Sequence, residues 1–165
     1  MAVVRLSVVA ALAGCASAAS QPTPPPPIKA SGIKVPTGWQ ALPDLATAVE
    51  NAAHADGITV EGSEAWGEPA RGCYAAWISL RGGDANLLLA DDIASGVAGE
   101  KIQMTDVVKP PSDGIMSFAF SRAPYRGKVK AKLERGRVIA IACFANDREP
   151  ASCDATCATL LGSLS

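Results

Sequence analysis

The sequence predicts an α+β domain built on a mainly antiparallel sheet of about five to seven strands, with helices packed on it, including a C-terminal helix. Three observations predict this class. Short apolar segments follow one another across turn residues in the second half of the chain. Apolar residues recur at helical spacing in two segments of the first half and again at the end of the chain. Because the strands are grouped and do not alternate singly with helices, antiparallel pairing is favoured.

The first half contains two of the predicted helices. One begins at Pro43, with Asp44 in its first turn and Gly57 after its end. The segment 71–81 is apolar on both faces, which indicates a central strand covered on both sides. The other elements predicted here are a short strand and turn over 34–39, a strand over 58–61, and a second helix over 84–99 that Asp84 caps.

The second half is rich in strands. Residues 125–133 alternate between basic and apolar side chains, so one face of this strand is predicted to be buried. Residues 138–145 are apolar on both faces, and Pro150 opens a C-terminal helix with one apolar stripe. The remaining strands are predicted over 102–108 and 115–121.

The segment between the first two long strands is acidic. Glu61, Glu64 and Glu68 flank Trp66, and glycines interrupt the run. The pattern predicts a loop between strands. Trp66 then either stands at the rim of a binding site, since loops on rigid scaffolds often carry function, or packs into the core, which is the favoured interpretation.

The N-terminus has the features of a secretory signal. Residues 1–5 form a cationic head, and residues 6–14 form an apolar run that is too short to span a bilayer as a helix. The run ends in Leu12-Ala13-Gly14-Cys15, which resembles the lipobox of bacterial lipoproteins. That resemblance implies removal of residues 1–14 and acylation of Cys15; the alternative is an ordinary signal peptide with a chance cysteine.

The predicted organisation is therefore a signal peptide over 1–14, a lipidated cysteine and proline-rich tether over 15–31, and one globular domain over 32–165. Four consecutive prolines, 24–27, favour an extended spacer. The order of elements in the domain resembles the small sandwich folds of the PsbP type, which also occur in bacterial lipoproteins. Residue 16 is alanine and not aspartate. In a diderm cell, the resemblance to enteric lipoproteins then implies sorting to the outer membrane, facing the periplasm.

The charge balance argues against nucleic acid as a partner. Without the signal peptide, 14 basic side chains stand against 16 acidic ones, so no whole-molecule field attracts a polyanion. One local exception is a basic stripe that alternates with apolar residues on the strand 125–133. It is either a solvated sheet face, the favoured interpretation, or a surface for an anionic partner, and its members are Arg126, Lys128, Lys130 and Lys132.

Four cysteines remain in the domain, and an exported chain favours two disulfides. Cys143 and Cys153 are close in sequence across a tight connection, so the favoured pairing is Cys143–Cys153 with Cys73–Cys157. The swapped pairing, Cys143–Cys157 with Cys73–Cys153, follows closely.

The function expected from these features is a lipid-anchored, non-catalytic binding or accessory domain in the cell envelope, with an unknown partner or ligand and no cofactor or metal. The alternative is a copper or thiol-exchange protein that uses Cys153 and Cys157, because a C-x-x-x-C spacing resembles that of thioredoxin-like copper-delivery proteins. A third hypothesis is a hydrolase built around His54. The usual catalytic motifs are absent, and the match of Ser31 to Lys34 with S-x-x-K has no companion motifs.

Overall fold

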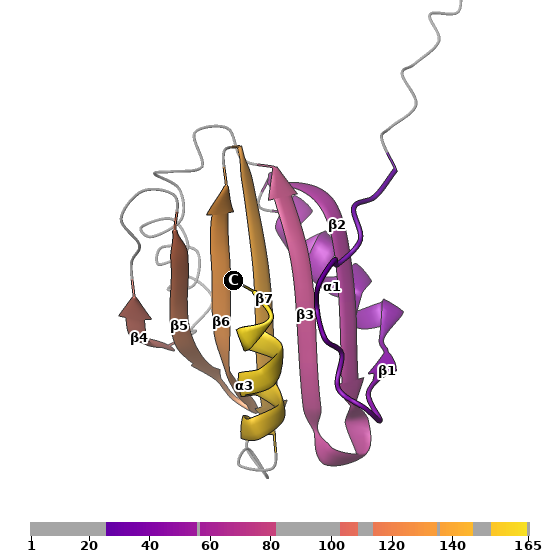
Figure 1. Ribbon diagram of the computed structural model, residues 1–165, viewed down its shortest axis with the longest axis vertical. Helices are drawn as coiled ribbons and strands as arrows, with labels where there is room; N and C mark the ends of the chain where they lie inside the picture. Colours follow the sequence, from indigo (N-terminus) through magenta and orange to yellow (C-terminus); the bar gives the residue numbers. More distant parts are fainter. Residues whose placement is uncertain are drawn as a thin grey trace, which may run out of the picture.

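The computed structural model describes residues 26–55, 57–81, 103–108, 114–134, 136–146 and 153–164. These residues form a seven-stranded antiparallel sheet in the order β1-β2-β3-β7-β6-β5-β4, with helices packed on it (Figure 1). The predicted α+β class with a C-terminal helix is confirmed, although strands dominate. The elements are β1 (Gln40–Ala41), α1 (Pro43–Ala55), β2 (Thr59–Glu68), η1 (Pro69–Arg71), β3 (Cys73–Arg81), β4 (Gln103–Val108), β5 (Ile115–Arg122), β6 (Tyr125–Glu134), β7 (Arg137–Asn146) and α3 (Asp154–Gly162).

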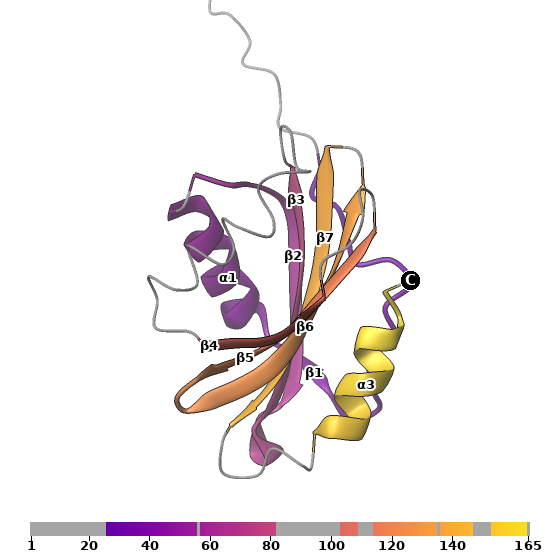
Figure 2. The ribbon, with the colours of Figure 1, turned by 90° about the vertical axis from the view of Figure 1, so that its left-hand side faces the viewer.

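The two described α-helices lie on opposite faces of the sheet. Figure 2 shows the sheet nearly edge-on, with α1 on one side and α3 on the other. On the α3 face, a core cluster forms from both ends of the sequence, and its buried members are Trp66, Ala75, Trp77, Ile141, Cys143, Leu160 and Leu164. A second cluster lies on the opposite face of the other half of the sheet, and its buried members are Met116, Phe118, Ala131, Leu133 and Val138.

An extended N-terminal segment, residues 26–39, crosses the α3 face beside β2 and β3; we call it the strap (Figure 1). The amide of Ile28 donates to the carbonyl of Glu61 at 2.8 Å, and the amide of Ala30 donates to Glu64 Oε1 at 2.8 Å. A Cβ at Gly62 would overlap the carbonyl of Ile28, so glycine allows this close approach. The last residues of the predicted tether therefore pack against the domain.

The predicted acidic loop is wrong: residues 59–68 form β2, which pairs along its length with β3. The charged residues of this segment made it resemble a loop, but two of them have specific partners in the folded domain. Glu64 accepts the hydrogen bond from the strap, and Glu61 binds arginines of β3 and β7. Trp66 is only 8% exposed and belongs to the core, as favoured. The segment 34–39 contains the predicted turn, closed by the hydrogen bond from the amide of Trp39 to the carbonyl of Pro36, but the predicted strand is wrong, since β1 begins at Gln40.

Some predictions fall on residues outside the described ranges. They concern the signal peptide, the lipobox with Cys15, the proline run up to residue 25, and the second helix over 84–99. Within the described ranges, no helix has both the length and the apolar character needed to span a membrane.

Candidate functional site

The basic side chains of β6 lie on the same face of the sheet as α3. Lys128 is the cross-strand partner of Cys143, which points towards α3, and residues two apart on a strand share a face. The alternating apolar residues Val129, Ala131 and Leu133 pack into the core on the other face. The predicted alternation is therefore correct. We call its basic members the basic row: Arg126, Lys128, Lys130 and Lys132.

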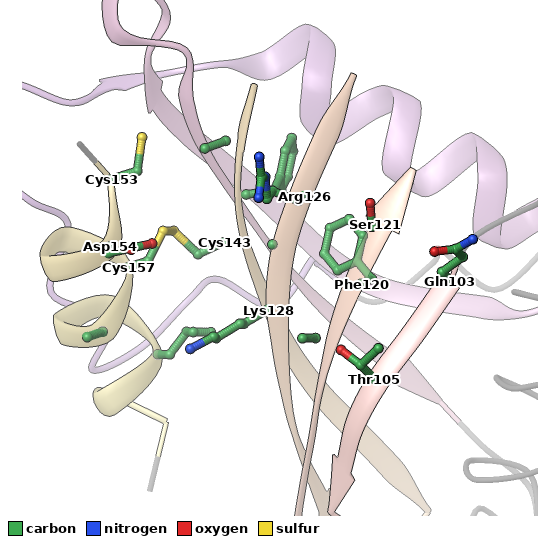
Figure 3. A pocket seen from close by; sticks show the side chains of 16 residues that line it. Gln103, Thr105, Phe120, Ser121, Arg126, Lys128, Cys143, Cys153, Asp154 and Cys157 are labelled. Atoms are coloured by element: carbon green, nitrogen blue, oxygen red, sulfur yellow. A yellow bond between two sulfur atoms is a disulfide. The ribbon is translucent and has the colours of Figure 1, made fainter. Parts of the chain in front are cut away.

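An open groove of about 540 Å³ lies between α3 and strands β4 to β6 (Figure 3). The helix lines one side with Cys157, Ala158 and Leu161. Arg126 and Lys128 line the groove from β6, and Figure 3 shows Lys128 extending towards α3. The far side carries small or uncharged polar side chains from β4 and β5, namely Gln103, Thr105, Ala119 and Ser121.

The pairing of β5 with β6 explains why the groove has open space next to the basic row. The cross-strand partners on β5 are Ser121 for Arg126, Ala119 for Lys128 and Ser117 for Lys130. These side chains are short, so the space above them stays open beside the basic row. On the other flank the row borders β7, whose residues at this level lie beneath α3.

The charges of the basic row are unevenly neutralised. Lys128 is exposed and Lys130 is half-buried, and neither has a carboxylate within ion-pair distance in the part of the chain that the structure describes. Lys132 lies 3.8 Å from Glu134, a partly exposed pair of small energetic value. Among the described lining residues, Asp154 in the first turn of α3 is the acidic one. The groove is therefore positive along β6, with the opposing charge of Asp154 at the start of α3 and that of Asp106 beside Thr105 on β4.

A charged cluster lies at the end of the sheet where β3 ends and β7 begins. Glu61 is 8% exposed and binds Arg81 Nε at 2.9 Å and Arg137 Nε at 2.5 Å, while Ser79 donates to it at 3.3 Å. The hydrogen bond from Arg137 lowers the pKa of Glu61 below its ordinary value of 4.5. Burial acts in the opposite direction, and the hydrogen bond from Arg81 adds to the lowering of the pKa. Both guanidinium groups are committed to this carboxylate.

Two disulfides join α3 to the sheet, and the favoured pairing is wrong. Cys73 is bonded to Cys153, with their Cα atoms 5.7 Å apart, and Cys143 is bonded to Cys157, at 5.5 Å. This is the swapped alternative that the sequence left open.

The register of β3 against β7 explains the pairing. Cys73 begins β3 and lies opposite Ala145, near the end where β7 leaves the sheet, whereas Cys143 lies two residues farther back. The chain returns from that same end, so the start of α3 meets Cys73 first. Cys157, one turn later, then meets Cys143. Nearness in sequence predicts Cys153 as the partner of Cys143, because the sequence alone does not give the register of β3 against β7.

Cys153 and Cys157 thus belong to different disulfides and are not a pair of neighbouring thiols. Within the described ranges, no three His, Cys, Asp or Glu side chains gather in a way that could hold a metal ion. His54 is exposed in the last turn of α1, and Ser31 and Lys34 are exposed on the strap. The structure brings none of these three into the groove.

Four aromatic rings contact one another on the face opposite α3. Phe144 stacks on Tyr74 with ring centroids 5.6 Å apart, and Tyr125 meets both rings edge-on. Phe120 completes the cluster at 6.3 Å from Phe144. A Cβ at Gly127 would collide with the backbone and Cβ of Phe144 on the neighbouring strand, which explains the glycine there.

Comparison with known proteins gives no family: no protein-family model matches the chain, and no curated protein matches it significantly. The candidate site therefore rests on geometry and charge alone. Sequence reasoning found the basic row but missed the groove, because Gln103, Thr105 and Ser121 carry no motif. Only the strand order brings them beside Lys128 and α3.

Proposed function

We propose that this protein is a lipid-anchored component of the cell envelope whose domain binds an anionic ligand in the groove between α3 and strands β4 to β6. The domain acts as a non-catalytic binding or accessory module. The observation that carries the proposal is the position of Arg126 and Lys128 in a groove whose opposite side offers uncharged hydrogen-bonding groups.

Charge and polarity define the class of ligand. Lys128 in the groove and Lys130, which follows it in the basic row, have no carboxylate partner in the described chain, so they favour an anion. Gln103 and Ser121 can donate hydrogen bonds to it, and Thr105, whose hydroxyl group donates to Asp106, can accept one. Ala158 and Leu161 contribute apolar side chains to the side of the groove that α3 forms. A charged side chain in a groove beside uncharged donors is a common arrangement for orienting a ligand.

The disulfides support a rigid binding site. They fix successive turns of α3 to β3 and β7, so the helical wall of the groove keeps its distance from the basic row. Preorganisation of this kind limits the entropy that binding must remove. Two disulfides also agree with an oxidising compartment outside the cytoplasm.

The envelope location rests on the N-terminal sequence. The cationic head, the apolar run and Cys15 together support export and acylation. In a diderm cell we place the domain at the outer membrane, facing the periplasm.

Binding of a sulfated polysaccharide, dextran sulfate, tests the proposal. The full chain in neutral detergent should bind the labelled polymer, and Lys128→Glu with Lys130→Glu should weaken binding about tenfold or more. A matched control, Lys29→Glu with Lys34→Glu, makes the same charge change on exposed residues of the strap. It should weaken binding less than about twofold. Equal losses in both variants would show that only net charge matters and would contradict a specific groove.

A further inference from the structure

The ligand class can be narrowed from the spacing of the basic row. Side chains that share one face of an antiparallel strand recur about every 6.8 Å. Arg126, Lys128 and Lys130 therefore form a row of three cations along one face of β6, and the row continues towards Lys132. A compact anion would meet one or two of them. A linear polyanion lying along β6 meets all of them at once.

We propose that the groove binds a linear, hydroxyl-rich polymer that carries one anionic group about every 7 Å, such as a polyol phosphate chain of the cell envelope. This inference rests on the proposed function and names the substrate class of the same groove. The chain lies parallel to β6, with its anions on the basic row and its hydroxyl groups on β5 and β4.

The polar side of the groove favours such a polymer over an extended acidic peptide. The neighbours of the basic row on this face include Ser117, Ser121 and Thr105, whose hydroxyl groups can exchange hydrogen bonds with those of a polyol. A peptide in the same place would lie on a sheet face, where the strands' backbone groups are already used in the ladders between β4, β5 and β6. Its own amides and carbonyls would gain no strand pairing there.

The packing of the aromatic side chains near the groove also argues against single-stranded nucleic acid as the ligand. Such ligands are held by bases stacked on aromatic rings as well as by cations. Phe120 and Phe144 belong to the groove lining, but their rings pack in the aromatic cluster with Tyr74. The described aromatic cluster of β3, β5, β6 and β7 lies on the opposite face, with Tyr74 stacked on Phe144. The basic row therefore offers groups for charge and for hydroxyl groups, whereas the rings nearest to it are already packed against one another.

The position of Asp154 makes one end of the groove less favourable for an anion than the other. Its carboxylate lies in the first turn of α3, the turn that follows Cys153, so it opposes an anion at the Arg126 end of the row. Towards Lys130 the described lining itself contains no acidic side chain, and the carboxylate nearest to it on β4, Asp106, accepts a hydrogen bond from Thr105 at 3.5 Å. The strongest attraction for the polymer is thus expected along Lys128 and Lys130.

Titration of the full chain in neutral detergent with poly(glycerol phosphate) of defined length tests this inference. Affinity should rise steeply up to about three or four repeats, the number that spans the row, and then level off. At equal total charge, polyphosphate should bind at least about threefold more weakly, because its charges are packed more closely than the cations. The variant Lys128→Ala with Lys130→Ala should remove the length dependence, whereas Lys29→Ala with Lys34→Ala should keep it.

Other outcomes separate this inference from the proposed function. If polyphosphate or dextran sulfate binds more tightly in order of charge density, the groove is a general anion site and the polymer class is wrong. Equal binding of a peptide with alternating aspartates would assign the groove to acidic peptides and overturn the inference. Tighter binding to vesicles of anionic phospholipid would assign it to the membrane surface. If none of these probes binds through Lys128 and Lys130, the proposed function fails as well.

Discussion

Glu61 shows how one charged residue can be placed inside a strand-rich core. Its carboxylate is almost fully covered, yet two guanidinium groups and one hydroxyl group satisfy it. The arginines come from β3 and β7, so this residue ties β2 to two strands whose order it helps to fix. A buried charge of this kind contributes specificity more reliably than stability, because desolvation offsets much of the attraction.

Replacing Glu61 by glutamine should destabilise the fold by about 1–2 kcal/mol. This is less than the loss of about 3–5 kcal/mol for a fully buried pair, because Arg81 and Arg137 keep 62% and 37% of their side chains exposed. Since the folded pKa is lowered, the stabilisation is complete above the ordinary value of 4.5 and is lost as pH falls through the lowered pKa. Urea unfolding of both proteins from pH 7 to pH 3 measures this. An unchanged pH dependence in the variant would contradict the account.

Gly62 is the residue on which the strap depends most closely. Replacing it with alanine should displace the strap, because the new Cβ would occupy the place of the Ile28 carbonyl. We expect faster proteolytic cleavage within residues 28–39 while the sheet keeps its circular dichroism. Gly162→Ala, where a Cβ meets nothing within 4 Å, is the control. Equal cleavage rates for the wild type and Gly62→Ala would show that the strap does not rest on this contact.

At the scale of elements, α3 is held by covalent bonds at two successive turns. The disulfide Cys73–Cys153 closes a loop of 80 residues, and Cys143–Cys157 closes one of 14. In the chain-entropy view the longer loop stabilises the fold more, because it restricts the unfolded chain more.

Removing each disulfide by paired alanine substitutions tests this pairing. Cys73→Ala with Cys153→Ala should cost about 4–5 kcal/mol, and Cys143→Ala with Cys157→Ala about 3 kcal/mol. The crossed variant, Cys143→Ala with Cys153→Ala, opens both bonds and should cost more than either. Denaturant unfolding gives the three values. If the crossed variant is no less stable than the other two, the result would support Cys143–Cys153 with Cys73–Cys157 and contradict the pairing in the structure.

The elements themselves were largely predictable, and their neighbours in space were not. The strict alternation over 125–133 and the C-terminal apolar stripe identified β6 and α3, because these patterns depend on local periodicity alone. The sequence predicts a loop in place of β2 because the ion-pair partners of its residue Glu61, Arg81 and Arg137, are distant in sequence. The groove could not be predicted from the sequence for the same reason, because it depends on the strand order, which is set by pairing between distant segments.

At the scale of the whole molecule, the proposed membrane anchor and the proposed binding domain would be joined by a short spacer. The strap packs on the domain from Ile28 onwards, so a lipid at Cys15, as proposed, would be separated from the fold by about a dozen residues. At about 3.1 Å per residue, an extended spacer reaches about 40 Å. The groove would then work close to the membrane and not far from it.

Replacing Cys15 with serine should leave a full-length precursor without acyl chains. Several acyl chains hold a protein firmly at the membrane, since each buried methylene contributes about 0.8 kcal/mol. Mass spectrometry of the N-terminus and fractionation of membranes measure the result. Normal cleavage and membrane retention of Cys15→Ser would show that Cys15 is not the anchor.

The reactivity of individual lysines towards an amine-acylating reagent tests the central claim most directly. Lys128 and Lys130 are in the basic row, and Lys29 and Lys34 are exposed on the strap as internal controls. With saturating poly(glycerol phosphate), acylation of Lys128 and Lys130 should slow about fivefold or more, while the strap lysines should change less than about twofold. Equal slowing at all four lysines, or none at Lys128 and Lys130, would contradict an anion-binding groove beside α3.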